Sequence, residues 1–160
     1  MSAKDSIRSQ YVGALAMLRQ AIEDCPDALW DDAGYANRFW HVAFHAIFFT
    51  HLYAQPQPDA LEPWEKHRQE LVALGRQAPG DLDTPYTRKE LLAYWTLCEQ
   101  QVGIRLQAAD LDAPSGFHWL PYDRLGVDIY NIRHLQHHTG ELCERLGAKG
   151  EVEVDWVKGS

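Results

Sequence analysis

The stretch FWHVAFHAIFFTHLY, residues 39–53, decides the fold, because apolar side chains would cover most of its circumference if it formed a helix. A helix of this kind is usually buried inside a bundle. The pattern predicts a helix over residues 35–53 that ends before the prolines of QPQP at residues 55–58. A buried histidine in this helix needs a partner, since an unpaired imidazole loses its hydration at a cost of a few kcal/mol.

Three further segments repeat apolar residues at helical spacing, and they predict helices over residues 5–24, 87–109 and 122–146. A segment of about thirty residues that includes several prolines separates the second long helix from the third. Within this segment, residues 65–74 favour a short helix. The fold expected is therefore all-α: a four-helix bundle with one long crossing connection between the second and third helices.

Capping residues indicate where these helices begin and end. Asp5 or Ser6 is a suitable cap for the first helix. Thr87 and Glu90 have the spacing of a capping box at the start of the third, and Gly147 is expected to close the fourth. The 160 residues are most simply one domain, 1–160, with an extended tail over about 148–160 whose alternating pattern resembles a strand.

Composition limits the classes of partner. The formal net charge is −8 and Lys and Arg are scattered singly, which argues against nucleic acid as a partner. No apolar run approaches the ~20 residues that span a bilayer, and the first ten residues lack the apolar core of a signal peptide. The three cysteines are widely spaced and form no disulfide pattern. These features predict a cytoplasmic protein without membrane or nucleic-acid partners.

Histidines are crowded into RHLQHHTGEL, residues 133–142. On a helix, His134 and His138 lie one turn apart on the same face, so both imidazoles can reach one point in space. An i, i+4 histidine pair is a common way for a helix to supply two metal ligands. His137 lies about 80–100° away around the helix and is not expected to join them.

A facing helix would have to supply a third ligand, and the second predicted helix offers His45 on a heavily apolar surface. His41, one turn earlier, is a rival for the same role or a supporting partner. The alternative for His45 is a core histidine that bonds a backbone carbonyl. The sequence thus predicts a metal site at His45, His134 and His138, with His41 as the open question.

The pairing of FWHVAFHAIFF on a second helix with NIRHLQHHTGEL on a fourth resembles the DinB-like superfamily of four-helix metalloproteins. This superfamily includes DinB and YfiT proteins and the bacillithiol- and mycothiol-dependent transferases. The resemblance covers the helix order and a tryptophan near the C-terminus, and it implies a three-histidine site at His45, His134 and His138. It also implies a homodimer. One departure is Glu141, where many relatives have glutamine; it is a candidate fourth ligand, a supporting residue or a solvated charge.

Three neutral imidazoles would leave a divalent metal with an open position, as in catalytic sites. Zinc or nickel is expected first, one ion per chain, with manganese or iron as alternatives. The activity implied is a metal-dependent hydrolase or a low-molecular-weight thiol S-transferase acting on a small-molecule substrate. No general base stands out among Glu141, His41, His137 and Tyr130, so the catalytic residues are unknown.

Two other functions are compatible with these residues. In the first, the metal only fastens two helices together and catalyses nothing. In the second, the protein is a metal-free helical dimer whose histidines pack or bond as ordinary core residues. Metal content separates the last from the others, and access of solvent to the metal separates the first two.

Overall fold

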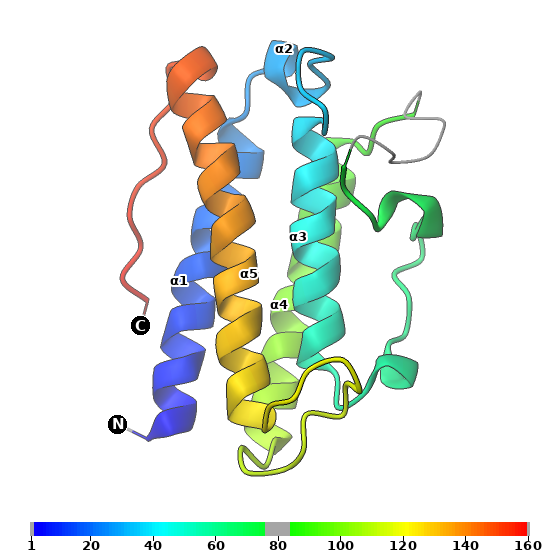
Figure 1. Ribbon diagram of the computed structural model, residues 1–160. Helices are drawn as coiled ribbons and strands as arrows, with labels where there is room; N and C mark the ends of the chain where they lie inside the picture. Colours follow the sequence, from blue (N-terminus) through cyan, green and yellow to red (C-terminus); the bar gives the residue numbers. More distant parts are fainter. Residues whose placement is uncertain (1, 76–83, 160) are drawn as a thin grey trace.

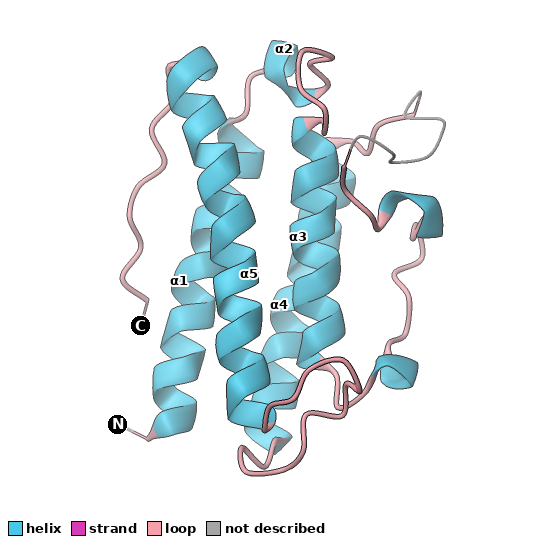
Figure 2. Ribbon diagram, in the orientation of Figure 1, coloured by secondary structure: helices cyan, strands magenta, loops and turns pink. Residues whose placement is uncertain are grey.

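The computed structural model describes residues 2–75 and 84–159, and it confirms that the protein is all-α. Over these residues it contains no strand, and none of its helices has the length and apolar composition to cross a membrane. The described residues form four long α-helices and one short one, and Figures 1 and 2 show how they are arranged. Their bounds are α1, Ala3–Asp24; α2, Asp27–Trp30; α3, Phe39–Ala54; α4, Arg88–Ala108; and α5, Arg124–Arg145.

The four long helices lie side by side, with α3 packed against both α4 and α5, and α1 packed against the same two helices (Figure 1). Helices α3 and α5 are antiparallel. At one end of the pair, Arg124 at the start of α5 donates a hydrogen bond to the carbonyl of Tyr53 at the end of α3. Further along, His45 of α3 meets His134 of α5. The antiparallel packing therefore brings the middle of α3 against the second half of α5.

Helix α3 is the most deeply buried element, as its sequence predicts. Every residue of α3 is buried except Phe49 and Leu52. The helix begins at Phe39 rather than at residue 35, and residues 31–38 form turns instead. Arg38, the residue before the helix, has an extended backbone and makes no side-chain cap. Contacts with neighbouring helices on several sides explain why an almost uniformly apolar sequence is stable here.

Capping at the start of α1 differs from the prediction, because Ser2 and not Asp5 or Ser6 is the cap. The hydroxyl of Ser2 accepts from the amide of Asp5, and the carboxylate of Asp5 accepts from the amide of Ser2. Asp5 thus fills the third helical position of a capping box, and the helix begins at Ala3, two residues before the predicted start. The capping box of Thr87 and Glu90 at the start of α4 is confirmed.

The end of α5 also corrects the prediction that Gly147 closes it. The chain continues through a π-helical turn over Leu146–Gly150, and the left-handed residue is Glu151, with φ of 53°. The predicted short helix over 65–74 is reduced to a 3₁₀ turn at Gln69–Leu71, and a second 3₁₀ turn occupies Pro58–Ala60.

The C-terminal tail lies extended against α1 and forms no strand in the described residues (Figure 2). The amide of Asp155 donates to the side-chain oxygen of Gln20 at 3.1 Å. Gly13 allows the tail to approach closely, since a Cβ there would lie 2.8 Å from the carbonyl oxygen of Val157. Of the alternating apolar residues, Val152 and Val154 pack against the core, whereas Trp156 is exposed, so only part of the pattern reflects a side that faces the helices.

A buried polar network joins α1, α3 and α5 near the start of α5. The guanidinium of Arg124 donates to the carbonyls of Tyr53 and Gln55 and to the carboxylate of Asp128 at 3.1 Å. The hydroxyl of Tyr11 donates to the same carboxylate oxygen of Asp128, also at 3.1 Å. The other oxygen of Asp128 is buried without a partner among the described residues. Burial raises the pKa of Asp128 even though Arg124 opposes it.

Candidate metal centre

Three histidine side chains converge between α3 and α5. The Nε2 atom of His134 lies 3.2 Å from Nε2 of His45 and 3.2 Å from Nε2 of His138. Ligand atoms of all three residues lie within 4.8 Å of one another. His45 and His138 are buried, and His134 is partly exposed. The structure therefore brings together the three residues that the sequence predicts.

The helices explain this convergence. His134 and His138 are one turn apart on α5, and the antiparallel packing of α3 places His45 opposite them. Phe49 lies one turn after His45 on α3. The centroid of its ring is 4.7 Å from the ring centroid of His45 and 5.3 Å from that of His134. Its contacts restrict the rotation of both imidazoles on the side facing α3.

Two of the imidazoles are oriented by hydrogen bonds on the side away from the cluster. Nδ1 of His45 lies 2.8 Å from the carbonyl oxygen of Val72, which can only accept. Nδ1 of His138 lies 2.7 Å from a carboxylate oxygen of Glu141. Both Nδ1 atoms therefore carry the proton, and each neutral ring turns an Nε2 lone pair toward His134.

Protons alone do not satisfy this arrangement. A neutral His134 protonated on Nε2 can place its single proton toward only one of the two facing lone pairs at a time. Its Nδ1 atom is buried and has no partner among the described residues. A divalent cation at the point of convergence would accept all three lone pairs at once, and ligating histidines typically bond a carbonyl or carboxylate through the other nitrogen.

The spacing of the ring nitrogens also fits a metal. Zinc–nitrogen bonds of about 2.0–2.1 Å at the tetrahedral angle place two ligand nitrogens about 3.3 Å apart. The observed separations from His134 are 3.2 Å. Two of the three separations therefore already match those expected around an ion of this size, and the ligand atoms of all three residues lie within 4.8 Å of one another.

Burial keeps the three histidines in the neutral form that binds metal. Desolvation lowers the pKa of His45 to about 4 and that of His134 to about 3. Burial also lowers the pKa of His138, although the carboxylate of Glu141 opposes the change. At neutral pH the nitrogens are thus free of competing protons, which is the condition for binding a cation.

These lowered pKa values predict that acid destabilises the metal-free protein. In the unfolded chain the histidines titrate near pH 6.5, so between that pH and about 4 the unfolded state binds more protons than the folded one. The free energy of unfolding is then fully present above pH 6.5 and falls as the pH drops toward 4. Urea denaturation in the presence of a chelator at several pH values measures this slope.

His134→Ala removes one of the titrating groups, so it makes the slope shallower. His51, whose pKa burial also lowers to about 4, contributes the same background slope to every variant. A slope that is the same for His134→Ala and the parent protein contradicts the prediction.

The ring of His41 lies outside the group of three converging histidines. Its Nε2 atom donates to the carbonyl of Leu71 at 2.8 Å, and its ring stacks on Trp40, 5.4 Å away between centroids. His41 thus contacts the segment that follows α3 and does not reach the point where the other three rings meet. Glu141 bonds the outer nitrogen of His138, so it orients that ring and is not a fourth ligand in this geometry.

A backbone carbonyl is the alternative partner expected for His45, and the structure shows that this carbonyl belongs to Val72, a position that sequence reasoning missed. No side-chain pattern indicates a main-chain acceptor that lies 27 residues from its donor in the sequence. The remaining base candidates are placed away from the convergence point. His137 is exposed and lies 3.7 Å from Glu141, and Tyr130 packs edge-on against Tyr53.

Comparison with known proteins adds no relative to this picture. No family model, no curated protein and no solved structure matches the chain. The resemblance to the DinB-like superfamily therefore stays a prediction that rests on the histidine motifs. The case for a metal rests on the geometry of the three imidazoles.

Proposed function

We propose that His45, His134 and His138 hold one divalent metal ion, zinc or nickel first, and that the protein is a metal-dependent enzyme. In this proposal the fold is a four-helix bundle of the DinB-like kind, with one long crossing connection between α3 and α4. The substrate class is a small molecule attacked by water or by a low-molecular-weight thiol. The reaction is accordingly hydrolysis or thiol S-transfer.

One observation carries the proposal. The outer hydrogen bonds of His45 and His138 aim two Nε2 lone pairs at the Nε2 atom of His134, an arrangement that a cation satisfies and a proton does not. A set of three protein ligands favours catalysis over a purely structural role, because structural zinc sites usually have four.

The residues of this chain have separable tasks in the proposed site. Val72 and Glu141 hold the tautomers of His45 and His138 and restrain their rings. Phe49 covers part of the cluster with an apolar face, which excludes water from that side. The metal, when bound, supplies Lewis acidity that lowers the pKa of a coordinating water or thiol toward neutrality.

Cobalt substitution tests whether the site has an open position. We expect the visible spectrum of protein loaded with Co²⁺ to change when 2-mercaptoethanol is added, because a thiolate can enter the coordination sphere. The same protein should then accelerate conjugation of that thiol to an electrophile such as 1-chloro-2,4-dinitrobenzene, or hydrolysis of 4-nitrophenyl acetate. His45→Ala is the matched variant without the complete ligand set.

The outcomes separate the competing functions. If the cobalt spectrum does not change when the thiol is added and no turnover is detected, the metal only fastens α3 to α5. If the protein takes up no cobalt at all, the site does not bind metal, and the three histidines are core residues that bond one another.

A further inference from the structure

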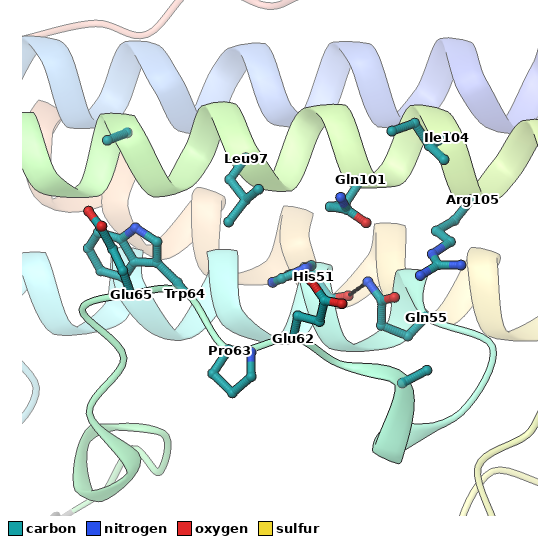
Figure 3. Close-up of a pocket in the computed structure, with 12 residues that line it drawn as sticks. His51, Gln55, Glu62, Pro63, Trp64, Glu65, Leu97, Gln101, Ile104 and Arg105 are labelled. Atoms are coloured by element: carbon teal, nitrogen blue, oxygen red, sulfur yellow. Dashed lines mark hydrogen bonds between the residues drawn. The ribbon is translucent and has the colours of Figure 1, made fainter.

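A cleft lies on a different side of α3 from the three histidines, between α3, α4 and residues 60–65 (Figure 3). Its volume is about 670 Å³, within the ~300–1,000 Å³ typical of small-molecule sites. His51, which lines the cleft, is six residues after His45, so it points about 120° away around the helix. The cleft is thus separate from the candidate metal centre.

His51 offers a hydrogen-bond donor to this cleft. The hydroxyl of Tyr94 is buried, and among the described residues its one hydrogen-bond partner is Nδ1 of His51 at 3.3 Å. A buried hydroxyl without an acceptor is costly, so Tyr94 donates to Nδ1. The ring proton of neutral His51 then lies on Nε2, which has no hydrogen-bond partner within the described part of the chain.

Arg105 offers a positive charge to the same cleft. Figure 3 shows its side chain reaching toward the space beside Gln55 and Gln101. Its Nε atom is buried without a partner, and no carboxylate of the described residues pairs with it within 4.0 Å. An unpaired guanidinium is unexpected in a protein with a net charge of −8, and its planar fork matches a carboxylate.

The rest of the lining limits the size and charge of a ligand. Trp64 is buried and stacks flat on Tyr94, with 4.6 Å between ring centroids, and Leu97 adds an aliphatic surface. This part of the cleft suits an apolar or aromatic body. Glu62 and Glu65 are exposed at the same opening, and their negative charges disfavour a ligand with several anionic groups.

We propose that this cleft binds a small monocarboxylate with an apolar or aromatic body. The carboxylate pairs with the guanidinium of Arg105 and accepts from Nε2 of His51, while the body packs on Trp64 and Leu97. The site acts independently of the metal proposed at His45, His134 and His138.

Calorimetric titration with 3-phenylpropionate tests the proposal on the 160-residue protein freed of metal by chelation and dialysis. We expect saturable binding that weakens at least about tenfold in Arg105→Gln, since the variant loses a hydrogen bond between two charged groups. Arg105→Lys should recover part of the affinity by restoring the charge without the fork. Lys89→Gln, which removes an exposed charge from the same helix, should leave the affinity unchanged.

The neutral analogue 3-phenylpropionamide separates charge recognition from apolar packing, and it should bind at least about tenfold more weakly than the acid. Equal affinity of acid and amide, equal affinity of Arg105→Gln and the parent, or no heat of binding to the parent at millimolar ligand would each overturn the proposal. Binding that disappears in His45→Ala but persists in Arg105→Gln would place the ligand at the histidine cluster and would overturn it as well.

Discussion

Purified protein is expected to contain about one zinc or nickel ion per chain, and His45→Ala and His138→Ala are each expected to lose it. Removal of an outer hydrogen-bond partner typically weakens metal binding 10–100-fold, so the loss of one of only three ligands should exceed about 100-fold. Plasma mass spectrometry after dialysis gives the stoichiometry, and competition with a chromophoric chelator gives the affinity.

Two control variants make this result specific. His51→Ala removes another buried histidine of α3 that points away from the cluster, so it should keep the metal. Glu141→Ala leaves all three ligands in place but removes the acceptor that orients His138, so its loss should be intermediate, about 10–100-fold. Full metal content in His45→Ala, or none in the parent protein after incubation with zinc and nickel, contradicts the three-histidine site.

Asp128→Ala, outside the candidate site, is expected to cost about 3 kcal/mol of stability. It leaves the buried guanidinium of Arg124 without its counter-charge, and breaking a buried pair in this way typically costs 3–5 kcal/mol. The lower end applies because Arg124 keeps the carbonyls of Tyr53 and Gln55 as acceptors. Urea denaturation of the parent and variant measures the difference.

Asp27→Ala provides the contrast, since Asp27 pairs with Arg88 at 2.7 Å but its side chain is 94% exposed. The solvent screens that pair, so its loss should be much smaller. Similar losses for Asp27→Ala and Asp128→Ala would mean that burial does not set the strength of the network around Arg124.

Much of the fold follows from local patterns in the sequence. The apolar circumference of residues 39–53 predicts a buried helix, and α3 is almost wholly buried. Helical spacing predicts that His134 and His138 share a face, and they do. These features depend only on periodicity and on the residue types present, both of which a single sequence contains.

Other features depend on distant parts of the chain and could not be predicted in the same way. His41 and His45 are both on α3 and both were candidates, and the choice between them depends on which one faces α5. The sequence predicts that Gly147 ends the last helix, but the chain continues through a π turn before Glu151 takes the left-handed conformation. A glycine is able to end a helix, but the packing of the following segment decides whether the helix ends there.

The hydrogen bonds from His41 and His45 to the carbonyls of Leu71 and Val72 have a consequence for engineering. Every amino acid carries a carbonyl, so substitutions at 71 and 72 can change the side chain and still orient both imidazoles, provided the backbone keeps its path. A designer who transplants the three histidines to another scaffold must therefore copy the course of this main-chain segment. The two hydrogen bonds depend on main-chain carbonyls and not on residue types, although the side chain of Leu71 is also part of the hydrophobic core, so a motif search cannot detect this half of the support.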